Sequence, residues 1–461
     1  MTELGRSTLA VDEIGWICDR LAGLENVIAP ELIRQVLAET GRVNERACPL
    51  THEVMMWVVL AMGLLTHIPI RQVFKHARRM RADEDTPGRS SLCEARQRLG
   101  VEPLKVLHAR VVHPLATLDT PGAFYQQFRW MGIDGTLFDV PDSEANAVFG
   151  RASGGRGEGA FPQVRKVSLV ELGTHVEVAM AIGGYHDSEQ ALARQLWDHI
   201  PVDAILLNDR GFFSYKDWKA LDSQGKTLLF RVKSNLVLKP IQHLSDGSYL
   251  TKIYPSFSDR RQDRHGIVVR VMDYTLDDPQ RTGHGEVHRL ITNLLDEIRY
   301  PARELIVGYH QRWEEELVFD EQKTHHNPRR AEKPAHLRSE SPAGVLQEVY
   351  ALSLGHFVVR SLMFAAAKPA KLDVDRLSFT GCLRILQCRL PECDSRTQLT
   401  LSQWYDALLY EMRQEQIEPR RNRTNPRVIK RKMSKWPKKR PHHKRTKPLT
   451  KRFEDSIVMT I

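Results

Sequence analysis

The 461-residue sequence has few cysteines and no hydrophobic run of membrane-spanning length. Its six cysteines are too sparse for a disulfide scaffold. The longest apolar run, Val54–Leu65, falls short of the roughly 20 residues that a transmembrane helix needs. The N-terminus carries early acidic residues and no apolar signal segment. We therefore expect a protein that works inside the cell and does not involve a membrane.

The sequence motifs of several classes of enzyme are absent. We find no G-x-S-x-G, no H-E-x-x-H and no cysteine that spacing pairs with a histidine. The cluster Cys382, Cys388 and Cys393 has neither C-x-x-C spacing nor a nearby histidine, so buried free thiols are expected there instead of zinc. The five glycines of 150–159 match neither the dinucleotide nor the Walker pattern.

Acidic residues are missing from one long C-terminal segment. Arg420–Arg452 holds sixteen of the 67 Lys and Arg and no Asp or Glu, so the rest of the chain has a net charge of −6 within a total of +10. Such a run is typical of a solvated, disordered arm, and we expect 419–461 to be one. Non-specific DNA contact through counterion release is one role for it, and solubility or nuclear localisation are the alternatives.

The N-terminal part, 1–120, is expected to be a helical, DNA-binding domain. Its segment Ser90–Gly100 is predicted to be a short helix, capped by serine and closed by glycine. Two arginines on this helix suit a DNA-reading role, but this segment alone favours the alternative, a solvated helical face.

From about residue 125 the pattern becomes mixed α/β. Strands are predicted at Phe128–Ile133 and Thr136–Val140, and a β-hairpin at 167–182. A strand at Ala204–Leu207 and another at Thr227–Val232 follow. This order favours a mixed sheet with helices, so we predict an α/β catalytic domain over 121–370.

Within that domain, 235–298 is predicted to be a β-rich insertion with charged turns. A long helix is expected to begin at Pro301 and to run through about His325. Helices are expected to continue through 371–418, which we treat as a separate C-terminal helical part.

Two aspartates occupy similar positions in this pattern. Asp134 and Asp209 each follow an apolar strand and precede a glycine-containing turn. Strand ends of an α/β sheet are where side chains converge on a ligand. A turn-forming role is the alternative for each one.

A further carboxylate lies on the predicted long helix. Successive residues of a helix are rotated by about 100° about its axis. On this helix Glu316 therefore shares a face with Tyr309, Arg312 and Lys323, within an arc of roughly 60°. Asp320 lies on nearly the same face, so periodicity alone does not choose between the two acids. A solvated charged helix is the alternative explanation.

The spacing Tyr309-x2-Arg312-x3-Glu316-x6-Lys323 resembles the signature of the insertion-sequence-four (IS4) family of DDE transposases. Ile133–Thr136 and Leu207–Phe212 resemble the two aspartate segments of that family, and Phe230–Lys233 resembles the basic strand that follows. The helical N-terminal segment is similar to the N-terminal domain of the same enzymes. The resemblance covers roughly 25–365.

The resemblance implies a ribonuclease-H-like mixed sheet with a β-rich insertion, preceded by a helical N-terminal domain. It implies Asp134, Asp209 and Glu316 as catalytic residues and metal ligands. Two Mg²⁺ or Mn²⁺ ions are the expected cofactors, because hard carboxylate oxygens suit these ions. The implied DNA-binding residues are Tyr309, Arg312, Lys323, Arg210, Arg231 and Lys233. Trp313 is open to two interpretations, covering a DNA base or packing in the core.

The implied function is that of a DNA transposase that binds the terminal inverted repeats of its element and moves it by cut-and-paste strand transfer. The expected partners are double-stranded DNA and a second copy of the chain in a synaptic complex, and the expected location is the cytoplasm, at the nucleoid. Alternatives are an inactive or repurposed DNA-binding relic, and a ribonuclease-H-like nuclease without strand transfer. Residues 235–298 contain no Trp, so a hairpin route would need another aromatic, namely Tyr249, Tyr254, Phe257 or Tyr274.

Overall fold

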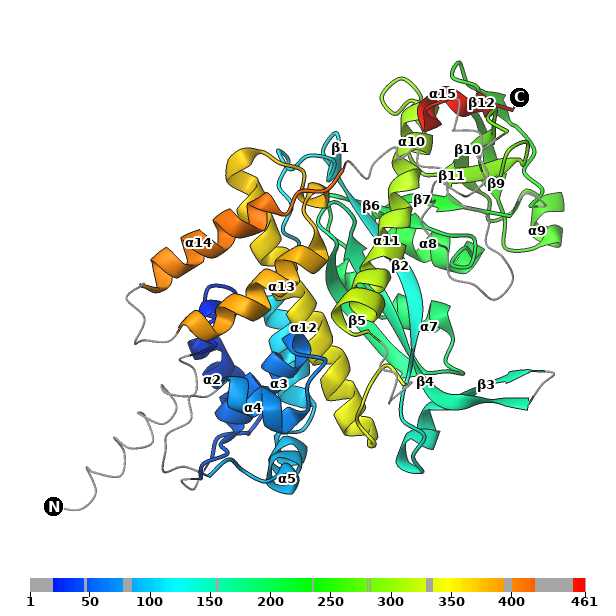
Figure 1. The fold of residues 1–461 in the computed structure, drawn as a ribbon. Coiled ribbons are helices and arrows are strands. Elements are labelled where there is room, and N and C mark those ends of the chain that lie inside the picture. The colour runs from blue at the N-terminus through cyan, green and yellow to red at the C-terminus, as the bar shows by residue number, and fades with distance from the viewer. Residues whose placement is uncertain are drawn as a thin grey trace, which may run out of the picture. The chain divides into compact units, whose positions relative to one another are not determined.

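A computed structural model describes residues 20–44, 48–77, 85–154, 157–233, 236–279, 281, 283–328, 335–393, 400–418 and 451–460 (Figure 1). The chain divides into two compact units, and neither is continuous in sequence. The first unit comprises Met1–Phe124, Asp134–His199 and Glu314–Ile417. The second comprises Tyr125–Ile133, Ile200–Trp313 and Glu418–Ile461.

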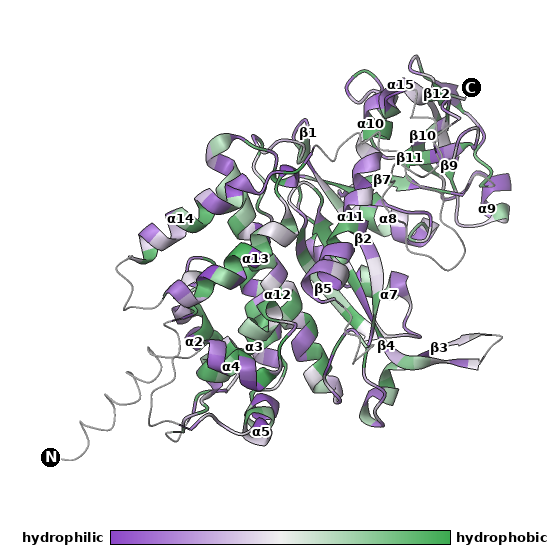
Figure 2. Cartoon of the chain, viewed as in Figure 1, coloured by the Kyte–Doolittle hydropathy of each residue, from purple (hydrophilic) through white to green (hydrophobic). Residues whose placement is uncertain are grey.

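The first unit is built on helices packed around α12, Pro342–Ala367. α3, His52–Leu64, is apolar on all sides because it is buried throughout, and Figure 2 shows hydrophobic residues along both helices. A Cβ at Gly63 would lie 1.9 Å from Ala351 O, so only glycine lets α3 approach α12 this closely. Further helices of this core are η1 (Ala22–Leu24), α2 (Pro30–Glu39), α4 (Ile70–Ala77), α5 (Arg89–Leu99), α6 (Glu102–Val111), η6 (Lys368–Ala370), η7 (Val374–Arg376), α13 (Phe379–Arg389), η8 (Leu390–Cys393) and α14 (Leu401–Gln414).

The segment Pro342–Ala370 is long and apolar enough to cross a membrane by length and composition. However, 78% of its most apolar window is buried inside the protein, as expected for the central helix of a core. The helical N-terminal part predicted from the sequence is confirmed. The cysteines Cys48, Cys93, Cys382, Cys388 and Cys393 are free, as expected, but of the three expected buried thiols only Cys382 is buried, whereas Cys388 is exposed and Cys393 is half-buried.

The first unit also contains the expected β-hairpin. β4, Gly157–Glu171, and β5, Val176–Gly184, pair antiparallel, with Glu171 opposite Val176. His175 in the connecting turn has a φ of +58°, a left-handed conformation that histidine adopts more readily than most residues. Shorter elements of this part are η2 (Ala145–Phe149), β3 (Arg151–Gly154), α7 (Glu189–Arg194) and η3 (Trp197–His199).

The second unit contains a parallel group of strands followed by an antiparallel one. β2, Phe128–Asp139, belongs to this unit up to Ile133, and this part pairs in parallel with β6, Ala204–Asn208, which pairs in parallel with β7, Thr227–Arg231. The β-rich insertion continues from β7 by antiparallel pairing, in the order β11 (His288–Thr292), β10 (Ile267–Leu276), β9 (Tyr249–Ile253) and β8 (Gln242–His243). The remaining short elements are β1 (Phe124–Tyr125), α8 (Tyr215–Ser223) and α9 (Phe257–Arg261).

The core strands run in the order β5-β4-β2-β6-β7. Antiparallel pairing between β4 and β5 is thus combined with parallel pairing among β2, β6 and β7. This confirms the expected ribonuclease-H-like mixed α/β sheet with a β-rich insertion.

The structure corrects one detail of the strand prediction. Asp134 and Gly135 do not form a turn, because β2 continues through them to Asp139. A Cβ at Gly135 would lie 1.9 Å from Glu189 Oε1, so this glycine permits close approach of a neighbouring side chain. The glycine that suggested a turn therefore serves packing within a strand.

The second correction concerns the C-terminus. Residues 451–460 form α15, Phe453–Ser456, and β12, Ile457–Met459, which pairs antiparallel with β10. Phe453 and Ile457 are buried. Burial of these apolar side chains stabilises ordered structure here, although the predicted tail is rich in basic residues. The rest of the predicted basic tail, 419–450, lies outside the described residues.

Candidate active site

Asp134 lies on β2, in the first unit, and its side chain is half-buried. Its Oδ1 accepts a hydrogen bond from the Gly135 N–H at 2.8 Å. Asp209 lies directly after β6, in the second unit, and is also half-buried. Its Oδ1 accepts from the Arg210 N–H at 2.7 Å, so both aspartates are held by the same local contact.

The register of the parallel strands relates the positions of the two aspartates. Gly132 of β2 lies opposite Leu207 of β6. Asp134 follows Gly132 by two residues, and Asp209 follows Leu207 by two residues. Each aspartate therefore has the same offset from this register pair.

Glu189, at the start of α7, is a carboxylate that sequence reasoning missed. It lies beside Gly135 and is 3.5 Å from Arg165. Burial raises the pKa of the Glu189 carboxyl, Arg165 lowers it, and the charge of Asp134 raises it again, with a net increase. The side-chain-free Gly135 was the one sequence signal for this approach.

The expected long helix is present but irregular. It consists of α10 (Ala302–Tyr309), a 3₁₀ turn η4 (His310–Arg312), α11 (Trp313–Asp320) and a π-helical turn η5 (Glu321–His326). Short π segments inside helices occur frequently at functional sites. The irregular turns alter the helical spacing, so the arc calculated for a regular α-helix does not apply along the whole segment.

Glu316 is exposed on α11, whereas Glu314 and Glu315 are buried. Asp320 is also exposed, and its Oδ2 lies 3.4 Å from His325 Nε2. Exposure therefore does not distinguish Glu316 from Asp320, and the choice of Glu316 still depends on the signature spacing.

Lys323 has a contact that the sequence did not predict. Its Nζ donates to Leu137 O at 2.7 Å and to Thr136 Oγ1 at 3.2 Å. The residue is half-buried and belongs, like Glu316 and Asp134, to the first unit. It thereby ties η5 to the part of β2 that follows Asp134.

Tyr309 and Arg312 are buried within the second unit, with 6% and 8% of their surface exposed. The Tyr309 hydroxyl donates to Asn208 O at 3.2 Å, which fixes the end of α10 against the residue before Asp209. Burial raises the pKa of the Tyr309 hydroxyl. The Arg312 guanidinium lies 5.5 Å from the ring centre of Trp313, which is 53% exposed and therefore not a core residue.

The remaining basic candidates lie in the second unit. Arg210 and Lys233 are exposed. Arg231 is half-buried at the end of β7 and lies 3.2 Å from His288 Nδ1. These side chains supply positive charge near the ends of β6 and β7.

The four aromatic residues weighed for the insertion divide into two groups. Tyr249 and Tyr274 are buried. Tyr254 and Phe257 line a cavity of about 340 Å³ within the second unit, and Phe257 is 66% exposed. The latter pair offers aromatic surface on which a base is able to stack.

A second group of potential metal ligands lies in the first unit. His175, Glu314 and Asp375 are buried and offer ligand atoms within 4.8 Å of one another. Burial and Arg360 disfavour protonation of His175, but Asp375, Glu321 and Glu314 outweigh them and raise its pKa to about 9. The imidazole Nε2 faces Glu314 and Asp375, and Nδ1 lies close to both Glu321 and Arg360, so the ring has polar partners without a metal.

Two family models match this chain. The family described as "Insertion element 4 transposase N-terminal" matches residues 19–109, and the family "Transposase DDE domain" matches residues 131–341. The chain therefore belongs to the IS4 family of DDE transposases. It is an enzyme of this class, which implies dependence on a divalent metal.

Two curated relatives come from Escherichia coli strain K12. The transposase InsG of insertion sequence element IS4 is 27% identical over 448 residues, covering 94% of this chain and 97% of the relative. The putative transposase InsZ is 27% identical over 202 residues, covering 42% of this chain and 65% of the relative. A piggyBac transposase synaptic complex with hairpin DNA gives a TM-score of 0.42 at 11% identity, covering 85% of each chain.

Proposed function

We propose that this enzyme binds the terminal inverted repeats of an insertion sequence and catalyses metal-dependent DNA cleavage and strand transfer. Asp134, Asp209 and Glu316 are the proposed catalytic residues and metal ligands. Two Mg²⁺ or Mn²⁺ ions are the proposed cofactors. We also propose a homodimer in the synaptic complex, since two DNA ends suit two-fold symmetry, and a cytoplasmic, nucleoid-associated location.

The observation that carries the proposal is the shared offset of the two aspartates from the register pair Gly132 and Leu207. Neighbouring parallel strands carry side chains at matching positions to the same edge of a sheet. Both aspartates also accept a hydrogen bond from the next N–H, which orients each carboxylate. The third carboxylate, Glu316, is exposed and thus accessible to a ligand.

The donor set fits hard divalent cations, because all three candidates are carboxylates and none is fully buried. Two such ions, when bound, activate water or a DNA 3′-hydroxyl and neutralise the leaving oxygen in phosphoryl transfer. The chain itself contributes position and charge: the Gly135 and Arg210 N–H groups orient the two aspartates, and Lys323 fixes η5 against β2.

We propose Arg210, Arg231 and Lys233 as DNA phosphate contacts near the ends of β6 and β7. Tyr309, Arg312 and Lys323 remain proposed DNA-binding residues. Each has an intramolecular contact, since Tyr309 reaches Asn208, Arg312 lies on Trp313, and Lys323 reaches β2. These contacts orient the side chains in advance, which reduces the entropy lost when DNA binds.

The test begins with the inverted repeats that flank the gene, used as cleavage substrates with Mg²⁺ or Mn²⁺. Asp134→Asn, Asp209→Asn and Glu316→Gln are each expected to abolish cleavage while leaving DNA affinity within a factor of about two. Asp320→Asn is the matched control on the same helix and is expected to retain cleavage. Full cleavage by Glu316→Gln, or its loss only in Asp320→Asn, would overturn the assignment.

Strand transfer is tested separately from cleavage. A pre-cleaved repeat with a free 3′-hydroxyl and a supercoiled target plasmid should yield joined products with the wild-type enzyme. Cleavage without any joining would instead support a ribonuclease-H-like nuclease. Sedimentation of the enzyme with the repeat should show two chains and two DNA ends in one complex.

A further inference from the structure

A buried group of charged and polar side chains holds the inner face of the helix that carries Glu316. We propose that this positioning cluster, formed by His175, Glu314, Glu321, His356 and Arg360, fixes the rotation of α11 and η5 and thereby directs Glu316 to the metal. The inference rests on the proposed role of Glu316. All five residues belong to the first unit.

The inner and outer faces of α11 differ sharply in burial. Glu314 is 8% exposed and Glu315 is fully buried, whereas Glu316 is exposed. Glu314 and Glu316 are two residues apart, which separates their directions by about 200° on a helix. Contacts that hold Glu314 inward therefore hold Glu316 outward.

His175 is the residue that joins the two acidic members of the cluster. Its Nε2 lies 2.8 Å from Glu314 Oε2, and its Nδ1 lies 3.2 Å from Glu321 Oε1. The imidazole is fully buried, and the backbone has a φ of +58°. A left-handed non-glycine residue carries strain that persists only where the surroundings require it, which favours a functional reason for this turn.

Glu321 is the anchor of the π-helical turn. Its carboxylate accepts from Arg360 Nε at 3.0 Å and from His356 Nε2 at 2.9 Å, and it also contacts Arg360 Nη2. Arg360 and His356 both come from α12, the central helix of the unit. The planar guanidinium fixes the direction as well as the distance of its partner.

Buried ion pairs of this kind are weak evidence for stability, because desolvation offsets most of the Coulomb gain. They do specify geometry, since a small displacement leaves a buried charge unpaired. The five side chains of the cluster, of which Glu314 and Glu321 lie on the helix segment itself, are therefore explained better by orientation than by stability. The adjoining Gln322 is fixed as well, because its Oε1 lies 2.5 Å from Lys166 Nζ.

Lys323 transmits the same orientation to β2. It follows Gln322 within η5, and its Nζ donates to Leu137 O and Thr136 Oγ1. Thr136 lies two residues beyond Asp134 on the same strand. The positioning cluster therefore fixes the inner face of α11 and η5. Lys323, in the same segment, contacts β2, the strand that carries Asp134.

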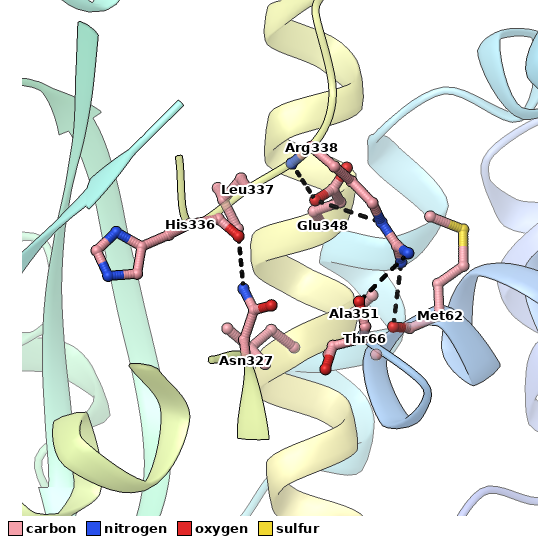
Figure 3. A pocket seen from close by; sticks show the side chains of 10 residues that line it. Met62, Thr66, Asn327, His336, Leu337, Arg338, Glu348 and Ala351 are labelled. Carbon is pink, nitrogen blue, oxygen red and sulfur yellow. Dashed lines mark hydrogen bonds and ion pairs between the residues drawn. The ribbon is translucent and has the colours of Figure 1, made fainter. Parts of the chain in front are cut away.

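The experiment compares Glu321→Gln with the matched control Glu348→Gln, both made in the full chain. Glu348 lies on α12, like Arg360 and His356, and is 8% exposed. It accepts from the Arg338 N–H at 3.0 Å (Figure 3). It also contacts Ser339 and Arg96, and all three partners lie outside α11 and η5. The control therefore makes the same chemical change in a buried ion pair without touching the helix of Glu316.

Three quantities are measured: Mn²⁺ affinity by electron paramagnetic resonance titration, cleavage rate at saturating DNA and Mn²⁺, and the melting temperature. Loss of an outer partner that orients a metal ligand typically costs 10–100-fold in metal affinity or activity. For Glu321→Gln we expect at least about a tenfold loss in Mn²⁺ affinity and in maximal rate, with DNA affinity unchanged. Glu348→Gln should lower the melting temperature comparably and leave both other quantities within about twofold.

The inference is wrong if Glu321→Gln and Glu348→Gln change Mn²⁺ affinity and rate equally. Full activity of Glu316→Gln would instead remove the proposed function itself, so the two failures are distinguishable. If Glu321→Gln does not fold, His175→Asn decides by the same measurements, because asparagine tolerates the left-handed backbone while removing the imidazole link. Unchanged Mn²⁺ affinity in His175→Asn would equally overturn the inference.

Discussion

Replacing Arg270 by methionine is expected to destabilise the second unit by about 3 kcal/mol. Arg270 lies on β10 and its side chain is fully buried. Its Nε donates to Ser248 Oγ at 2.8 Å, its Nη1 donates to Tyr300 O at 2.6 Å, and its Nη2 contacts Asp246. The residue thus joins the insertion to the turn that precedes α10.

The magnitude follows from what methionine would leave behind. Removing one partner of a buried ion pair typically costs 3–5 kcal/mol, because the other charge stays buried. Asp246 is 19% exposed and keeps hydrogen bonds from Ser248 N at 3.1 Å and Ala302 N at 2.8 Å. The expected loss of stability is therefore at the lower end of this range, about 3 kcal/mol. For a unit of this size the loss corresponds to a melting temperature lower by about 6–12 °C.

The assay is urea unfolding, with hydrogen exchange to locate the effect in peptides from β9, β10 and the start of α10. Lys252→Met is the matched control, because Lys252 forms its ion pair with Asp263 at 2.7 Å in the same insertion but at the surface. We expect no measurable change for the control. A loss below about 1 kcal/mol for Arg270→Met would refute the reasoning, since that is the range of exposed ion pairs.

Three other predictions probe different parts of the structure. Gly63→Ala should destabilise the first unit by ~1–3 kcal/mol in urea titrations, because its Cβ would lie 1.9 Å from Ala351 O. Gly211→Ala should leave stability unchanged, because no atom lies within 4 Å of the new Cβ. Burial raises the pKa of Glu177, but Lys166, Ser353 and Ser168 outweigh it and lower the value to about 2, so stability should fall as the pH drops from about 4.5 towards 2. Glu177→Gln should flatten that part of the stability–pH curve, and an unaltered curve would contradict it. Arg210→Ala and Lys233→Ala should each reduce the slope of log affinity for DNA against log salt by about 1 without changing the melting temperature, and an unchanged slope would exclude a phosphate contact.

Much of the fold was predictable because the sequence carries local signals for it. The hairpin around His175, the apolar strands at 204–207 and 227–232 and the helix from Pro301 follow from periodicity and turn residues. The signature spacing that begins at Tyr309 identified the family. These features depend on residues close together in the sequence.

What the sequence missed depends on long-range contacts. Gly135 suggested a turn, but its role is to admit Glu189 from a segment more than fifty residues away. The 3₁₀ and π turns around α11 alter the helical spacing, and no periodic pattern announces them. The burial of Phe453 within a basic segment likewise arises from a distant partner, the His310 ring.

We propose that Asp134, Asp209 and Glu316, from distant parts of the chain, jointly bind the metal. This proposal is tested most directly by replacing Mg²⁺ with Fe²⁺, generating hydroxyl radicals at the bound iron and mapping the backbone cuts by mass spectrometry. If these three carboxylates bind the metal, the cuts cluster around residues 134, 209 and 316 and are suppressed by excess Mg²⁺ and by Glu316→Gln. Cuts centred on His175, Glu314 and Asp375, with none near Asp209, would contradict it.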